Sequence, residues 1–192
     1  MLEYLKIYEI VKEHFIKHSN IKRFEHSERV VDMALKLNAI HNLHLDVEKL
    51  KITAIIHDYA KVYDDELIEI IKKEFENDKL LLQSKTVHHA IVGDIILKNE
   101  FGIDDEEILD AVKYHTTGKP NMSTFCKVIF LADYIEMGRS FESVNEVRNI
   151  AFNNLDNAVL KALEITINYI KSLGYVVYPL TIDTYNYYKK GE

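Results

Sequence analysis

Apolar residues recur every three or four positions along nearly the whole chain, which is the spacing of one buried face of an α-helix. The apolar positions of a first predicted helix are Leu5, Tyr8, Val11 and Phe15. A second helix is predicted to begin near His26, with the apolar positions Val30, Met33, Ala34 and Leu37. A third is expected from Asp46 toward Lys61. Because the 192 residues include only two prolines and six glycines, we predict an all-α fold.

Polar residues at the ends of apolar runs indicate where further helices begin and end. The segment 104–107 places a capping aspartate three residues ahead of a glutamate, and an apolar series then leads to His115. We expect this helix to deliver His115 at its C-terminal end. Ser123 is the predicted cap of another helix, which carries Asp133 among apolar residues.

The C-terminal part of the chain is predicted to form a long helix from about Leu155 to Leu173, before Gly174, and a short closing helix after Pro179. The charged stretch from Lys72 to Lys79 is expected to be an exposed helix end and loop. Neither an internal repeat nor a linker rich in proline, glycine or serine divides the chain. We therefore expect one domain over residues 1–192.

Composition narrows the classes of partner. Hydrophobic residues make up 47% of the chain and charged residues 29%, which is an ordinary globular balance. The 24 basic and 31 acidic residues give a net charge of −7, which opposes binding to nucleic acid. An acidic protein binds a phosphorylated substrate when metal cations and a few local lysines or arginines reverse the charge inside a pocket. Metal binding is therefore an early expectation.

The cysteine count and the N-terminus bear on the compartment. Cys126 is the single cysteine, so the chain forms no internal disulfide and needs no oxidising environment. Residues 1–16 alternate charged and apolar side chains, unlike a secretory signal, and no later apolar run is long enough to span a bilayer. We expect a cytoplasmic protein with no membrane partner.

The most informative segment is 52–61, where an apolar predicted helix presents the adjacent polar residues His57 and Asp58. Buried histidine and aspartate side chains are costly unless they are paired or coordinated, and a divalent cation satisfies both. Alone, the dipeptide is weak evidence for a metal site, because a surface pair or an internal hydrogen bond is commoner.

Other histidines and an aspartate at helix ends or core faces strengthen this hypothesis. His26 is expected to open one helix, His89 to open a later one, and His115 to end another. Asp133 has apolar neighbours on both sides, which disfavours a purely solvent-facing role. A buried hydrogen-bond acceptor is the alternative interpretation of Asp133, and a metal ligand is the favoured one.

Taken in order, these residues resemble the pattern of the HD-superfamily phosphohydrolases: His26, His57, Asp58, His89, His115 and Asp133. The segments 57–61, 89–93, 114–118 and 132–136 are more specifically similar to the YqeK-like group of symmetrical bis(5'-nucleosyl)-tetraphosphatases. Arg139 and the segment 178–181 extend the likeness. The chain departs from this group at Ile91, where proline is expected, and at Lys119, where arginine is usual.

The resemblance implies a helical bundle with a two-metal site. The metal-binding core would cover about 22–137, with the C-terminal helices against it. One ion would be held by His26, His57, Asp58 and Asp133, and the other by His89, His115 and a bridging Asp58. Iron is the metal that the resemblance implies. Mixed imidazole and carboxylate ligands suit manganese and zinc equally well, so these stay open.

By the same resemblance, diadenosine tetraphosphate and related nucleotides would be cut symmetrically into two nucleoside diphosphates. Two close cations activate a water for attack at phosphorus, so neither a serine nor a cysteine nucleophile is required. Asp58 and Lys61 are the predicted catalytic residues. The predicted substrate contacts are Lys61, Thr117, Gly118 and Arg139, and Lys119 is a further candidate cation. For Lys61, an i, i+4 relation to His57 on one helix is the expected geometry.

Two alternative functions stay open. The first is another HD phosphohydrolase, such as a nucleotidase or a phosphodiesterase, which would share the fold and the metal ligands. The second is a non-catalytic sensor that binds a nucleotide at the metal site, which the full set of six ligands disfavours. The expected partner is a small nucleotide, and a homodimer is open.

Several residues are assigned lesser roles. His88 is the alternative to His89, because adjacent side chains of a helix point about 100° apart and both would not reach one ion. His14 and His18 are expected on a solvated helix face, and Cys126 in the core. Nucleobase stacking is an open alternative to core packing for the C-terminal tyrosines Tyr175, Tyr178, Tyr185, Tyr187 and Tyr188.

Overall fold

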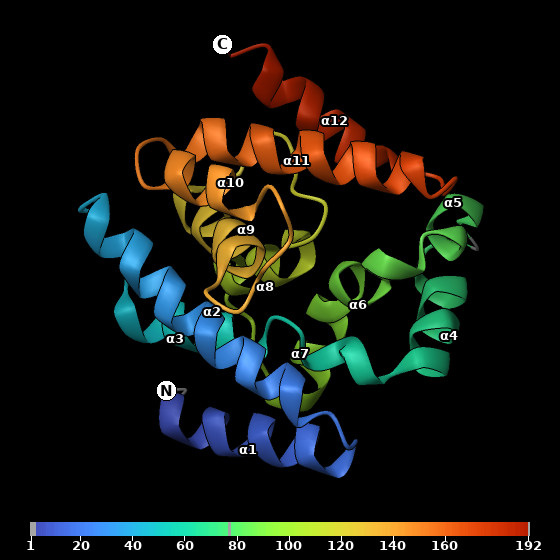
Figure 1. The fold of residues 1–192 in the computed structure, drawn as a ribbon. Coiled ribbons are helices and arrows are strands. Elements are labelled where there is room, and N and C mark those ends of the chain that lie inside the picture. Colours follow the sequence, from blue (N-terminus) through green and yellow to red (C-terminus); the bar gives the residue numbers. More distant parts are fainter. Residues whose placement is uncertain (1–2, 77, 192) are drawn as a thin grey trace.

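The computed structural model describes residues 3–76 and 78–191, and every regular element within these ranges is a helix (Figure 1). The first six α-helices are α1 (Tyr4–Lys17), α2 (Ile21–Ile40), α3 (Val47–Ile56), α4 (Asp64–Glu74), α5 (Lys79–Gln83) and α6 (His88–Ile91). The remaining ones are α7 (Gly93–Phe101), α8 (Glu106–Tyr114), α9 (Thr124–Ile135), α10 (Val144–Ala151), α11 (Leu155–Ser172) and α12 (Pro179–Lys189). Two 3₁₀ turns are η1 (Tyr59–Val62) and η2 (Lys85–Val87). The all-α prediction is confirmed.

Helix α9 forms the centre of the molecule and contacts α2, α3, α8, α10 and α11. Its sequence is apolar on nearly all sides, as expected for a helix surrounded by others. In Figure 1, α1 and α12 lie at opposite ends of the molecule, and α4 and α5 form one edge. Among the described residues, no helix is both long enough and apolar enough to cross a bilayer.

Several predicted helix ends are confirmed. The Ser123 hydroxyl accepts a hydrogen bond from Cys126 N at 3.1 Å and caps α9. Helix α8 ends at Tyr114, so His115 lies at its C-terminal cap. Helix α11 ends with Leu173 as its cap, and Gly174 follows with a φ of 75°. These three helix ends lie where the sequence placed them, and the Ser123 side chain makes the predicted cap bond.

The expected start of α2 is wrong, because the helix begins at Ile21 and His26 lies in its second turn. The Asn20 side chain makes no cap hydrogen bond, so the true start lacks the usual polar signature. The expected cap of α8 is also shifted by one residue. Asp105 accepts hydrogen bonds from Glu107 N and Ile108 N, whereas Asp104 has no such role.

The third helix is shorter than expected. It begins after the Asp46 cap, as expected, but ends at Ile56 instead of continuing to Lys61. The chain then tightens into the 3₁₀ turn η1, where Lys61 N donates to Asp58 O at 2.9 Å. His57 and Asp58 therefore lie at the junction of two helical segments, and this break turns both side chains toward the interior.

Candidate metal centre

Asp58 lies at the centre of the histidine cluster and is 2% exposed. Its Oδ1 lies 3.1 Å from His89 Nε2 and 3.5 Å from His115 Nε2. Its Oδ2 lies 3.5 Å from His57 Nε2 and 3.8 Å from His26 Nε2. The two oxygens of one carboxylate therefore face two separate pairs of imidazoles.

Asp133 joins the pair formed by His26 and His57. Its Oδ1 lies 3.0 Å from His26 Nε2 and 3.8 Å from His57 Nε2. The side-chain ligand atoms of these three residues lie within 4.8 Å of one another, and so do those of His57, Asp58 and His115. These groups have the size of metal-ligand clusters.

The six side chains come from five parts of the fold. His26 belongs to α2, the His57–Asp58 pair follows α3, His89 belongs to α6, His115 caps α8 and Asp133 belongs to the last turn of α9. The structure thus brings together all six residues that the sequence singled out. Their convergence depends on how α9 lies against α2, α3 and α8.

Backbone carbonyls fix the orientation of two of the imidazoles. His57 Nδ1 lies 2.7 Å from Ala54 O, and His115 Nδ1 lies 2.7 Å from Val112 O. A carbonyl only accepts hydrogen bonds, so each Nδ1 carries a proton, and in the neutral ring the lone pair is then on Nε2. Both lone pairs lie on the side of Asp58, which is the arrangement of a metal-ligating histidine with an outer partner.

Two buried nitrogens in the cluster make no hydrogen bond of acceptable geometry with any described residue, although both lie near the Asp133 carboxylate. These are His26 Nε2 and His57 Nε2, on side chains that are 7% and 0% exposed. A buried polar atom without a partner costs free energy, and a metal ion in contact with it removes that cost. Together with the two carboxylates, the donor set fits a divalent cation.

Burial also selects the protonation states that bind metal. It lowers the pKa of His57 to about 3 and that of His89 to about 4, so both imidazoles are neutral at neutral pH. Burial opposes ionisation of Asp58, yet the imidazoles and Lys61 around it hold its pKa well below the usual range. Neutral imidazoles and an ionised carboxylate are the forms that coordinate cations.

Three cationic side chains border the cluster. Arg23 Nη1 lies 2.8 Å from Asp58 Oδ2, and Lys61 Nζ lies 3.6 Å from Asp58 Oδ1. Arg139 Nη2 donates to Asp133 Oδ1 at 2.6 Å, and its Nε donates to Asp133 O at 3.1 Å. Lys61 and Arg139 were predicted from the sequence, whereas Arg23 was not.

The positions of two of these cations follow from local geometry. Arg23 precedes His26 by three residues and shares its face of α2, a signal that appears only once the helix is known to start at Ile21. Lys61 reaches Asp58 across the 3₁₀ turn as an i, i+3 pair. The expected i, i+4 relation to His57 on one continuous helix is therefore wrong.

The loop after His115 has structural roles of its own. Thr117 is fully buried, and its hydroxyl donates to Gly118 O at 2.8 Å. Gly118 has a φ of 62°, and a Cβ there would lie 2.7 Å from Thr184 Cγ2, so only glycine fits. Their substrate contacts stay predictions. Lys119 pairs with Asp110.

The structure separates the two adjacent histidines. His88 Nε2 lies 2.7 Å from Leu81 O, whereas His89 Nε2 faces Asp58.

The prediction that His14 lies on a solvated helix face is wrong. This ring is 8% exposed and stacks on Tyr59 with centroids 3.9 Å apart, because η1 covers that side of α1.

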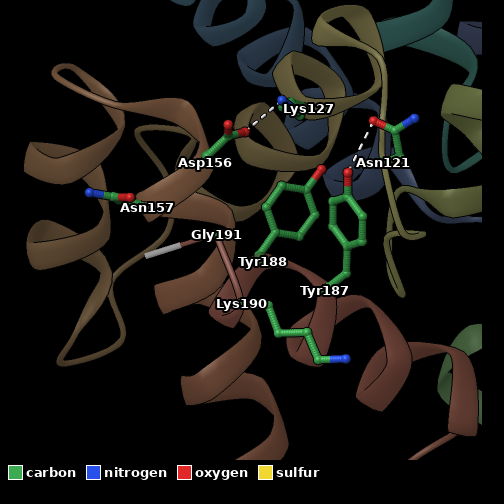
Figure 2. Close-up of a pocket in the computed structure, with 8 residues that line it drawn as sticks. All are labelled: Asn121, Lys127, Asp156, Asn157, Tyr187, Tyr188, Lys190 and Gly191. Atoms are coloured by element: carbon green, nitrogen blue, oxygen red, sulfur yellow. Dashed lines mark hydrogen bonds and ion pairs between the residues drawn. The ribbon is translucent and has the colours of Figure 1, made fainter.

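Two hollows are lined in part by candidate residues from the sequence analysis. One of about 340 Å³ adjoins the cluster and is lined by Lys61, Leu67, Lys85, Thr86 and His89. Another of about 460 Å³ lies beside α12 (Figure 2), and its lining includes none of the six clustered residues. In that hollow the Tyr187 hydroxyl donates to Asn121 Oδ1 at 3.3 Å. Tyr188 is 8% exposed and accepts from Met122 N, which fits a packing role.

Cys126 is 2% exposed, and burial raises the pKa of its thiol. The expectation of a core cysteine is confirmed.

Glu136 was missed as a functional candidate, although it follows Asp133 by three residues. Its carboxylate lies 3.2 Å from His26 Nδ1.

Comparison with known proteins identifies the family to which the chain belongs. Residues 23–138 match the family described as the HD domain. The symmetrical bis(5'-nucleosyl)-tetraphosphatase of Halalkalibacterium halodurans is 37% identical over 182 residues, which is 94% of each chain. The enzyme of the same name from Staphylococcus aureus is 38% identical over 172 residues, which is 87% of each chain.

A solved structure has the same fold. It is the crystal structure of a predicted HD superfamily hydrolase involved in NAD metabolism from Clostridium acetobutylicum. The TM-score is 0.88 at 36% identity, over 96% of this chain and 98% of that one. With a family match over more than half of its length and relatives at this identity over most of it, the chain belongs to the HD-domain family, in the group of the symmetrical bis(5'-nucleosyl)-tetraphosphatases.

Proposed function

We propose that this protein hydrolyses diadenosine tetraphosphate and related dinucleoside polyphosphates symmetrically, to two nucleoside diphosphates, with two divalent cations. The observation that carries this proposal is the arrangement at Asp58, whose two carboxylate oxygens face two separate pairs of imidazoles. A bridging carboxylate between two nitrogen-rich sets suits a two-cation site for phosphate hydrolysis. The activity of the tetraphosphatase relatives agrees with this chemistry.

The proposed ligands divide into two sets that share Asp58. The first set is completed by His26, His57 and Asp133, and the second by His89 and His115. When bound, the cations supply an activated water and neutralise charge on the phosphoryl oxygens. Iron is the proposed native metal, with manganese and zinc as alternatives, because all three accept mixed imidazole and carboxylate ligands.

The chain's own cations complete the proposed site. Arg23, Lys61 and Arg139 border the cluster, and Lys85 joins Lys61 in the adjoining hollow. We propose that they hold the polyphosphate of the substrate, since a guanidinium binds phosphate oxygens through paired hydrogen bonds. They provide local positive charge on a chain of net charge −7. No serine or cysteine nucleophile is required.

The test is anaerobic turnover of diadenosine tetraphosphate by iron-loaded protein, with the products separated by chromatography. The expected product is ADP alone, and an Asp58→Ala variant is expected to form none. AMP together with ATP would contradict symmetrical cleavage. Absence of turnover by fully loaded protein would contradict the proposal and favour another HD phosphohydrolase or a nucleotide sensor.

A further inference from the structure

Glu136 is a buried carboxylate that contacts the cluster of histidines and aspartates from its outer side. It is the C-terminal cap residue of α9, and it is 2% exposed. Its Oε1 lies 3.2 Å from His26 Nδ1, on the opposite side of the imidazole ring from the Nε2 that faces Asp133. His26 therefore lies between two carboxylates, one on each ring nitrogen.

The position of Glu136 is itself fixed by two donors. Arg29 Nε, from the next turn of α2, donates to its Oε2 at 2.6 Å, and Gly138 N donates to the same oxygen at 2.5 Å. A Cβ at position 138 would overlap the Arg29 guanidinium, so the glycine leaves the space in which Arg29 reaches the carboxylate. Arg148 donates to Glu136 O at 3.0 Å and secures the backbone.

This outer partner differs in kind from those of the other oriented imidazoles. His57 and His115 donate Nδ1–H to neutral backbone carbonyls. A carboxylate acceptor holds the His26 ring by a charge-assisted hydrogen bond and makes its Nε2 a more basic ligand. The two proposed ligand sets are therefore supported differently. Among the described contacts of these three rings, only the Nδ1 of His26 lies against a side-chain carboxylate.

We propose that Glu136 is a positioning residue for His26, and that it strengthens divalent-cation binding by the set His26, His57 and Asp133 without affecting the set His89 and His115. This inference rests on the proposed two-metal function. Outer-shell partners of metal-ligating histidines contribute about 10- to 100-fold in metal affinity. Removing Glu136 is expected to weaken one of the two binding events by that factor.

The test measures Mn²⁺ binding to the whole chain by the electron paramagnetic resonance signal of free Mn²⁺. Two backgrounds separate the ligand sets: His89→Ala leaves the set with His26, and His26→Ala leaves the set with His89. Glu136→Ala is expected to lower affinity by about 10- to 100-fold in the first background and to leave it unchanged in the second. Glu136→Gln retains an acceptor for Nδ1–H, so its loss is expected to be smaller.

Two controls keep the result specific. Glu142→Gln removes an exposed carboxylate from the same loop and is expected to change affinity in neither background. Thermal melting of the metal-free variants checks folding, and if Glu136→Ala does not fold, Glu136→Gln carries the comparison. Equal losses in both backgrounds, or no loss in the first, would overturn the positioning role. A wild-type protein that binds no Mn²⁺, Fe²⁺ or Zn²⁺ would instead contradict the two-metal function.

Discussion

At the scale of single residues, the site depends on charges that are held close together in the interior. Asp58 is surrounded by four imidazoles, and Arg23 and Lys61 lie at its outer side. Arg23 lies closer to this carboxylate than Lys61 does, and its side chain is 26% exposed. It balances the buried charge, and its partial exposure supports the proposal that it contacts a substrate phosphate.

Replacing Arg23 by alanine is expected to raise KM for diadenosine tetraphosphate by about 10-fold or more, because a hydrogen bond to a charged group contributes about 1.5–3 kcal/mol. Steady-state kinetics of the metal-loaded variant measure this change. The neighbouring exposed Lys22, replaced by alanine, is the matched control and is expected to leave KM unchanged. Equal KM values for Arg23→Ala and the wild type would contradict the phosphate-binding role.

At the scale of elements, helix ends position several of the proposed ligands. His115 caps α8 at its C-terminus, and the N-terminus of the same helix is capped by Asp105. Lys49 of α3 lies 2.8 Å from the Asp105 carboxylate, so one side chain joins the two helices whose ends carry His57 and His115. The cap therefore supports the site from the far end of the helix.

Asp105→Ala is expected to lower the free energy of unfolding by about 1 kcal/mol, the usual cost of losing an N-cap. Urea denaturation measures the change. Asp104→Ala is the matched control, and it is expected to have little effect because the cap bonds are made by Asp105. The opposite ranking of the two variants would contradict the observed cap and restore the one expected from the sequence.

Most helices could be predicted from the sequence, but some of their ends could not. Apolar periodicity predicts α1, α9 and α11 well, and the side-chain caps Ser123 and Asn154 agree with it at the starts of α9 and α11. Asn20 makes no side-chain cap bond, and an apolar run hides the end of α3 at Ile56. Neither end carries a local polar signal, so the sequence pattern did not place it.

At the scale of the whole molecule, the proposed ligands span more than a hundred residues of sequence and are brought together by the packing of helices around α9. Their types and order were readable from the sequence through the family resemblance, but local patterns carried no information about their convergence. Arg23 and Glu136 were missed for this reason, since each gains its role only from a contact with a distant segment. The buried charges also make folding depend on pH.

Metal-free protein is expected to lose stability as pH falls from about 7 toward about 4. Burial lowers the pKa of His57 to about 3 and of His89 to about 4, whereas unfolded histidine titrates near 6.5. The unfolded chain therefore binds more protons in this window, and protonation favours unfolding. The pKa values of Asp58 and Asp133 are also depressed, and their contribution is lost only near and below about 4.

Thermal melting of chelator-treated protein across this range measures the effect. His57→Gln is expected to flatten the dependence of melting temperature on pH, and His44→Gln, which changes an exposed histidine, is expected to leave it unaltered. A melting temperature that stays constant or rises as pH falls would contradict the burial of neutral imidazoles.

Asp58 is proposed to bridge two cations, and anomalous diffraction from crystals grown with Mn²⁺ is the measurement that locates them. Two anomalous peaks per chain are expected. One should lie within coordinating distance of Asp58 Oδ1, His89 and His115, and the other near Asp58 Oδ2, His26, His57 and Asp133. A single peak, or two peaks that do not share Asp58, would contradict the bridging role.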